Sequence, residues 1–196
     1  MRKLTSFLPI YLCVALSLGA RPQSTSLESF VPSPSQVFYL DLDTAEGSFS
    51  QWRHEGLASL SALSATIRVP RLRNDRKWVP TFCIWLQDAG IGEERRRLGV
   101  RLTALAKKPP LGIQVIHANK GELISSEALP IEVGLDENLA VGMVWATPHS
   151  VTITAGERET RTIPLPWLVE SIAVTASTGQ LKVDPLVLGT VRSSRN

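Results

Sequence analysis

Residues 172–189, IAVTASTGQLKVDPLVLG, carry the pattern that decides the fold. In the first part of this stretch the apolar side chains of Ile172, Val174 and Ala176 alternate with smaller or polar neighbours. A Ser-Thr-Gly turn at 177–179 separates it from a second part with similar alternation. Side chains two residues apart lie on the same face of a β-strand, so the stretch predicts two strands joined by a turn.

The same period of two recurs through most of the chain. Short runs with this period lie at 38–42, 65–69, 81–86, 100–103, 113–115, 139–145, 151–154 and 159–163. The run at 81–86 is apolar on both faces, which predicts a central strand covered on both sides. Residues 57–63, LASLSAL, can form either a short helix or a loop. The pattern predicts an all-β fold, a two-sheet antiparallel β-sandwich of the jelly-roll type.

The first twenty residues differ from the rest. Arg2 and Lys3 precede an apolar run interrupted by Pro9, and the small residues Gly19 and Ala20 follow. This order is typical of a cleavable signal peptide, and the run is shorter than the roughly 20 residues that a membrane-spanning helix needs. We therefore expect a secreted or periplasmic protein with no stable membrane anchor after cleavage.

Four segments are expected along the chain. They are a signal peptide at 1–20, a Ser/Pro-rich linker at 21–36, the β-sandwich domain at 37–192 and a short tail at 193–196. The linker is too polar and too rich in proline for a regular element. A domain of this length can bury a sizeable core.

Charge and cysteine content exclude several functions. The chain has 21 basic and 18 acidic residues, and loss of Arg2 and Lys3 would lower its net charge from +3 to +1. A nearly neutral domain without a reader motif is not expected to bind nucleic acid. Loss of Cys13 would leave Cys83 alone, which excludes an internal disulfide and a zinc site made of thiolates. Cys83 itself is expected to be a small buried residue.

The C-terminal half resembles a known family. A strand ending in Trp145 is followed by Val151–Thr154, a turn at Gly156, an apolar stretch at 165–168 and then the stretch 172–189. This order is similar to the closing section of concanavalin A-like lectin/glucanase sandwiches, especially their laminin G-like branch. The resemblance implies a jelly roll, a fold that hosts lectins, hydrolases and adhesion modules alike.

The resemblance also implies a test for catalysis. Hydrolases of that superfamily use carboxylates spaced along one strand face, in an order Glu-x-Asp-x-x-Glu, which is absent from this sequence. Glu157 and Glu159 have a spacing of two but flank Arg158 in a predicted turn, and Asp41 and Asp43 also share one strand face. We expect a protein without catalytic residues, and a divergent glycoside hydrolase stays an alternative.

Tryptophans are the first candidates for ligand binding. The C–H face of a sugar ring stacks on an indole ring, so an exposed tryptophan is the usual platform for a carbohydrate. Trp52 and Trp78 have polar neighbours and are the expected surface candidates. Trp85 and Trp145 lie inside apolar strands and are expected in the core.

Basic side chains are the second candidates. Arg73 and Arg76 lie in the predicted loop 71–77, and a further run of arginines occupies 95–97. Gathered at one rim, they can bind an acidic glycan. Acidic residues within both segments equally fit ordinary solvated loops.

Asp43 and Asp184 are candidates for a calcium site. They come close if the first and last strands pair, as they do in the family that the chain resembles. Calcium needs six or more oxygen ligands, and the sequence suggests only these two, so solvated strand-end carboxylates are the alternative. No other cofactor is expected.

Together these observations predict an exported, non-catalytic binding module whose leading ligand is a carbohydrate, such as a glycan or cell-surface polymer. A structural or adhesion domain that binds a protein partner is the alternative, and a divergent glycoside hydrolase is the second alternative.

Overall fold

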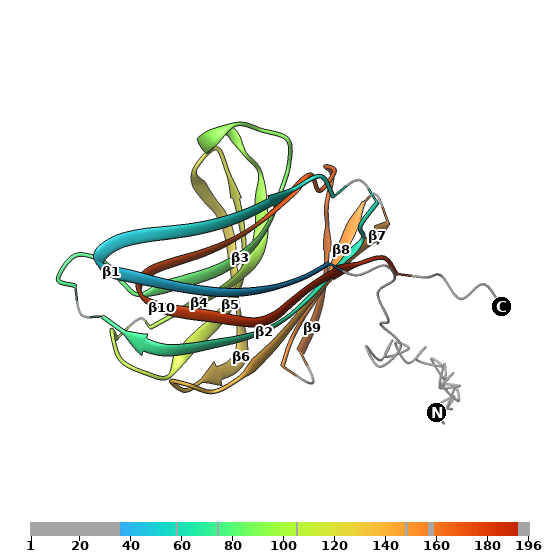
Figure 1. Ribbon diagram of the computed structural model, residues 1–196. Helices are drawn as coiled ribbons and strands as arrows, with labels where there is room; N and C mark the ends of the chain where they lie inside the picture. The colour runs from blue at the N-terminus through green and yellow to red at the C-terminus, as the bar shows by residue number, and fades with distance from the viewer. Residues whose placement is uncertain are drawn as a thin grey trace, which may run out of the picture.

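The computed structural model describes residues 36–57, 59–73, 75–104, 106–147, 149–156 and 159–191 (Figure 1). The predicted signal peptide and tail, and nearly all of the predicted linker, lie outside these residues. The described strands are β1 Gln36–Glu55, β2 Ala62–Leu72, β3 Thr81–Gln87, β4 Arg97–Thr103, β5 Leu111–Asn119, β6 Glu122–Val133, β7 Leu139–Thr147, β8 Ser150–Ala155, β9 Glu159–Pro164 and β10 Ser171–Gly189. A 3-10 turn, η2 at Gly92–Glu94, precedes β4. The all-β prediction is confirmed, and nothing in the described part forms a helix long and apolar enough to cross a membrane.

Two long strands, β1 and β10, run through both layers of the fold (Figure 1). The first half of β10 pairs with β3 and with the second half of β1, and β4, β5 and β6 follow outward from β3; we call this the β3 sheet. The second half of β10 pairs with β2 and with the first half of β1, and β7, β8 and β9 follow outward from β2; we call this the β2 sheet. The predicted two-sheet antiparallel sandwich is therefore confirmed.

The bend of β10 lies at Thr178 and Gly179, where the sequence predicted a turn. The strand does not reverse there but continues as one element of 19 residues, with Thr178 at a φ of 57°. A Cβ on Gly179 would lie 2.7 Å from the carbonyl oxygen of Arg71 and 2.9 Å from Cζ of Phe82. The predicted reversal of the chain was wrong. Gly179 is needed because β10 passes close to Arg71 and Phe82 here, and not because the chain makes a tight turn.

Inward-facing side chains of both sheets form one hydrophobic core. On β3 these are Phe82, Ile84 and Leu86, each at most 1% exposed. Burial of an apolar side chain of this size stabilises the fold by roughly 2 kcal/mol. The alternate residues of each strand therefore point to the outer faces, which are the surfaces open to a ligand.

Two strands were not expected, and one open alternative is resolved. In the segment predicted as a short helix or a loop, the Leu60 amide donates to the carbonyl oxygen of Leu57 in a turn, and β2 begins at Ala62. Leu57 and Leu63 are both buried in the core. The second half of β1 and all of β6 are strands that the sequence did not predict. Both are edge strands with mostly exposed side chains, so their apolar alternation is weak.

Candidate functional site

The outer face of the β3 sheet is the strongest candidate for a binding site. The antiparallel register aligns its side chains in rows across the strands. From β1 to β5, one row contains Arg53, Ala173, Trp85, Gly99 and Ile116, and the next contains Gln51, Thr175, Cys83, Arg101 and Gln114. Residues far apart in the sequence thus lie side by side on one face. The exposed or partly exposed members of the two rows are Gln51, Arg53, Trp85, Arg101 and Gln114, whereas the others are buried.

Trp85 lies in the middle of this face. Its side chain is half-buried, and its indole Nε1 donates a hydrogen bond to Thr175 Oγ1 at 3.3 Å. On the neighbouring strand, Gly99 must lack a side chain, because a Cβ there would lie 2.1 Å from the carbonyl oxygen of Ile84. Trp85 is therefore bordered by a position without a side chain. The prediction that Trp85 belongs to the core was wrong, since its alternation with Ile84 turns it outward.

Arginine side chains dominate the polar part of the face, namely those of Arg53, Arg95, Arg97 and Arg101. Arg101 donates from Nε to Gln114 Oε1 at 2.8 Å, and a second nitrogen of the same guanidinium donates to the same oxygen. Arg97 donates to the carbonyl oxygen of Gly92 in η2 at 3.2 Å. Both guanidinium groups are thus held by neutral partners and keep their full charge.

A hydrogen-bond network fixes the other two arginines at the end of the face. Arg95 donates to Gln87 Oε1 at 3.2 Å, and Ser171 Oγ donates to the same oxygen at 3.3 Å. Arg53 donates to Ser171 Oγ at 3.1 Å and forms an ion pair with Glu55 at 3.0 Å. These contacts set the guanidinium groups in fixed positions before any ligand arrives.

A pocket of about 420 Å³ lies at the opposite end of the same face. Phe49 and Trp78 line it, with 63% and 56% of their surface exposed, and Thr81 and Ser177 lie beside them. Phe49 and Thr81 are both register partners of Ser177, so the pocket continues the rows that contain Trp85. Trp78 lies at the surface, as the sequence predicted.

The loop before β3 holds Trp78 in place. Asp75 Oδ1 accepts hydrogen bonds from the backbone amides of Lys77 at 2.7 Å and Trp78 at 2.8 Å. The bond from Trp78 is the main cause that lowers the pKa of Asp75, and the bond from Lys77 adds to it. Lys107 Nζ donates to the carbonyl oxygen of Arg76 at 2.9 Å and ties the loop to the segment after β4.

Trp52 does not fit its predicted place as a surface platform. It packs partly buried against the core, with its ring 4.9 Å from that of Phe38 and stacked on that of His54 at 6.0 Å. These contacts join the first and second halves of β1, away from the bend at residues 44–49. Trp145 packs against the core as predicted, and its Nε1 donates to the carbonyl oxygen of Leu60 at 3.0 Å.

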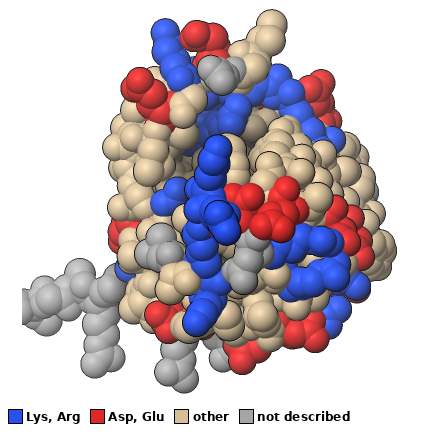
Figure 2. Space-filling model, turned by 90° about the vertical axis from the view of Figure 1, so that its left-hand side faces the viewer, with Lys and Arg blue, Asp and Glu red and all other residues tan. Residues whose placement is uncertain are grey.

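Arg73 and Arg76 lie at the end of the molecule where β1 and β10 bend. Figure 2 looks at this end and shows basic side chains gathered there with acidic ones beside them. Arg73 donates to Asp43 Oδ1 at 2.8 Å, and Arg71 donates to Asp43 Oδ2 at 3.0 Å, so two of these charges are matched locally. Arg76 is exposed. These residues lie outside the rows around Trp85.

The predicted calcium residues are not brought together. Asp43 is opposite Gln180, whereas Asp184 lies four residues farther along β10. Both carboxylate oxygens of Asp43 accept from arginines, and the bond from Arg73 is the main cause that lowers the pKa of Asp43. Within the described residues, no group of three or more His, Cys, Asp or Glu side chains could hold a metal ion.

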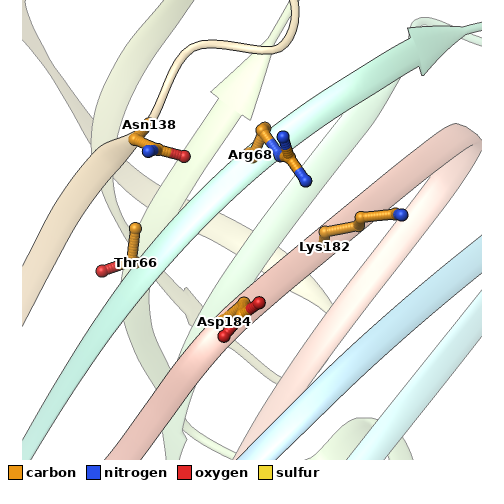
Figure 3. A pocket seen from close by; sticks show the side chains of 5 residues that line it. All are labelled: Thr66, Arg68, Asn138, Lys182 and Asp184. Atoms are coloured by element: carbon orange, nitrogen blue, oxygen red, sulfur yellow. The ribbon is translucent and has the colours of Figure 1, made fainter.

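Asp184 instead lines a shallow polar pocket of about 240 Å³ on the outer face of the β2 sheet (Figure 3). The pocket is lined by Thr66, Arg68, Asn138, Lys182 and Asp184. Arg68 pairs with Asp136 at 3.4 Å, and Lys182 pairs with Asp41 at 3.5 Å. This face therefore holds a polar depression in which the basic groups already have partners.

Cys83 is buried as predicted, but on the outer side of β3. Only 5% of its surface is exposed, and burial raises the pKa of its thiol to about 12. The thiol is therefore neutral at physiological pH and is no nucleophile.

The sequence analysis missed most residues of this face. Arg97 and Arg101 alternate with the apolar residues of β4, so a period of two already turned them outward. Trp85 gave no such signal, because both faces of β3 are apolar. Phe49 lies in the half of β1 that was not predicted as a strand.

Comparison with known proteins supports the fold. No protein-family model matches the chain, and no curated protein matches it in sequence. A β-glucanase from Bacillus licheniformis superposes with a TM-score of 0.50 at 12% identity, covering 79% of this chain and 78% of that protein. A β-1,3-1,4-glucanase (lichenase) derived from a mouse hindgut metagenome gives 0.51 at 9% identity, covering 79% and 80%. A Caenorhabditis elegans galectin gives 0.49 at 9% identity, covering 76% and 95%.

Proposed function

We propose that this concanavalin A-like jelly roll is a carbohydrate-binding protein and that the outer face of its β3 sheet is the ligand site. The expected superfamily resemblance is confirmed at the level of the fold, although no similarity singles out the laminin G-like branch. Identities of 9–12% establish a fold alone, so the carbohydrate assignment rests on the face itself.

Trp85 is the observation that carries this proposal. Trp85 is a large aromatic ring in the middle of an outer sheet face and is only partly buried, so its exposed part can stack with a sugar ring. Gln114 in the next row is also partly exposed, and its amide group can bond the hydroxyls of the sugar. Phe49 and Trp78 supply a second aromatic contact on the same face.

The distance between these contacts fits an oligosaccharide. Thr81 beside the pocket and Trp85 are four residues apart on β3, which corresponds to about 13 Å at about 3.3 Å per residue. A chain of several sugar units, rather than a single sugar, is therefore needed to reach from the pocket to Trp85.

The acidic residues of the described face support binding without hydrolysis. Glu55 and Glu132 are on the edge strands β1 and β6, with four strands between them. Five strand spacings of about 4.8 Å separate them by about 24 Å across the sheet, and they also lie at opposite ends of the strands, whereas glycosidases hold two carboxyl groups about 5–9.5 Å apart. We propose that the protein binds its ligand outside the cytoplasm, on the strength of the signal-like pattern at residues 1–20.

A glycan array tests the proposal. Neutral and acidic oligosaccharides are screened with the purified protein, and the best ligand is titrated by calorimetry. Phe49→Ala and Trp78→Ala are each expected to weaken binding about five- to tenfold by removing an aromatic contact. Tyr39→Ala is the matched control, because Tyr39 is an aromatic residue with 71% of its surface exposed on the opposite sheet.

Three results would contradict the proposal. They are an array without any bound glycan, an equal loss in Tyr39→Ala, and the release of reducing ends from the bound glycan. The first would favour a protein partner, and the last would favour a divergent hydrolase.

A further inference from the structure

We propose that the glycan bound on this face is anionic, with carboxylate or sulfate groups that Arg97 and Arg101 bind from either side of Trp85. This inference rests on the proposed function and specifies its substrate class. It comes from the placement of the arginines and from their lack of a carboxylate partner among the described residues.

The arginines flank the place where a stacked sugar would lie. Gly99 is opposite Trp85, and Arg97 and Arg101 are each two residues from Gly99 on the same face of β4. Each therefore begins about 7 Å from the bare backbone beside the indole. A sugar ring on Trp85 would have one guanidinium group on each side along the direction of the strand.

No carboxylate among the described side chains pairs with Arg97 or Arg101. Arg97 and Arg101 are held by a carbonyl oxygen and an amide oxygen, and Glu55 is the one carboxylate that pairs with an arginine among the described side chains of this face. Elsewhere the pattern is different, because Arg71 and Arg73 share Asp43. The β3 face therefore carries an excess of positive charge that attracts an anion.

The shape of the arginine side chain points the same way. Arg97 and Arg101 are both partly exposed, so a ligand can contact them. The planar guanidinium fork matches the paired oxygens of a carboxylate or sulfate group.

The test compares polymers that differ in charge but share a backbone. Calorimetry measures binding of polygalacturonate against its methyl-esterified form, and of dextran sulfate against dextran. The protein is expected to bind the anionic member of at least one pair at least about tenfold more tightly, with affinity falling as NaCl rises from about 0.05 to about 0.5 M. The pair that shows the difference tells whether carboxylate or sulfate is preferred.

Variants locate the contact. Arg97→Gln with Arg101→Gln is expected to weaken anionic binding at least about tenfold, whereas Arg97→Lys with Arg101→Lys, which keeps the charge but loses the fork, gives a smaller loss. Arg68→Gln with Lys182→Gln removes the same charge from the β2 sheet and is expected to leave affinity unchanged. Melting curves check that each variant is folded.

The outcomes separate the two proposals. Equal binding of charged and neutral polymers, unchanged in Arg97→Gln with Arg101→Gln, overturns the anionic assignment and leaves carbohydrate binding standing. Loss of binding to the same extent in the Arg68 and Lys182 variant overturns it as well, because the attraction is then nonspecific. Tighter binding of single-stranded DNA than of every glycan, or no binding of any glycan, overturns both proposals.

Discussion

The two outer faces of this sandwich are built from the same alternation but differ in how their charges are arranged. On the β2 sheet, Asp41, Lys182 and Arg68 form one row, in which Lys182 pairs with Asp41 and Arg68 pairs with Asp136. On the β3 sheet, arginines surround a tryptophan and a buried thiol, and most of their partners are uncharged. One face is satisfied by itself, whereas we propose that the other is completed by a ligand.

This difference shows what a fold alone leaves open. Both sheets contribute to the same core, so the fold provides two possible surfaces. Exposed ion pairs contribute little to stability, and they also leave no charge for a partner. Unpaired guanidinium groups next to an aromatic ring lower stability slightly and provide specific binding instead.

The largest effect is expected from adding a side chain at Gly99, where β3 and β4 approach closely. Gly99→Ala places a methyl group 2.1 Å from the carbonyl oxygen of Ile84, so β3 and β4 must move apart. We expect the free energy of unfolding to fall by about 3 kcal/mol, measured in urea. Gly112→Ala is the matched control on the same face, because its Cβ would meet nothing closer than 3.9 Å. Equal stability of the two variants would contradict a close approach of β3 and β4 at Gly99.

The buried thiol predicts the next largest effect. Because burial raises the pKa of Cys83 from 9.0 to about 12, the native state holds the thiol proton above pH 9 while the unfolded state loses it. Stability is therefore lost as pH rises above 9, by about 1.4 kcal/mol at about pH 10. We would measure the free energy of unfolding of the protein and of Cys83→Ala across this pH range. Every other group titrates in both proteins, so the difference between the two curves isolates the effect of the thiol. Parallel curves would mean that the outer side of β3 is open to water.

Exchanging tryptophans separates the binding face from the core. Trp85→Phe is expected to weaken glycan binding about fivefold, because it reduces the stacking surface. It also lowers stability by about 1 kcal/mol, because it removes the donor to Thr175 Oγ1. Trp145→Phe leaves affinity unchanged and lowers stability by about 1 kcal/mol, because it removes the donor to the Leu60 carbonyl. Calorimetry and urea unfolding of both variants give the comparison. A loss of affinity in Trp145→Phe but not in Trp85→Phe would place the binding site away from Trp85.

The smallest effect is expected at the exposed ion pairs near the bend. The pKa of Asp43 is lowered, mainly by its hydrogen bond with Arg73. The contribution of the Asp43 carboxylate to stability is therefore present above pH 3.8 and disappears as the pH falls through the lowered pKa. Because Asp43 is exposed to solvent, Asp43→Asn is expected to leave the melting temperature unchanged within error. An NMR titration should still find the Asp43 carboxyl titrating below 3.8. A clear loss of stability would mean that these pairs support the bend.

The sequence allowed the sandwich to be predicted because its strands alternate clearly on the core side. It did not reveal that Ser177–Gly179 bends a continuous strand, since a bend and a turn use the same small residues. It also could not tell which side of β3 faces out, because Phe82, Ile84 and Leu86 alternate with Cys83 and Trp85, which are apolar too. The register between strands, which only the folded chain defines, brings Trp85 next to Gly99.

An NMR titration of the isotope-labelled protein with the glycan that binds most tightly tests which face is the binding surface. We predict that the indole resonance of Trp85 and the backbone amides of Gly99 and Arg101 shift, and that those of Thr66, Arg68 and Lys182 stay in place. Shifts confined to the second group would contradict this account, because they would put the ligand on the β2 sheet.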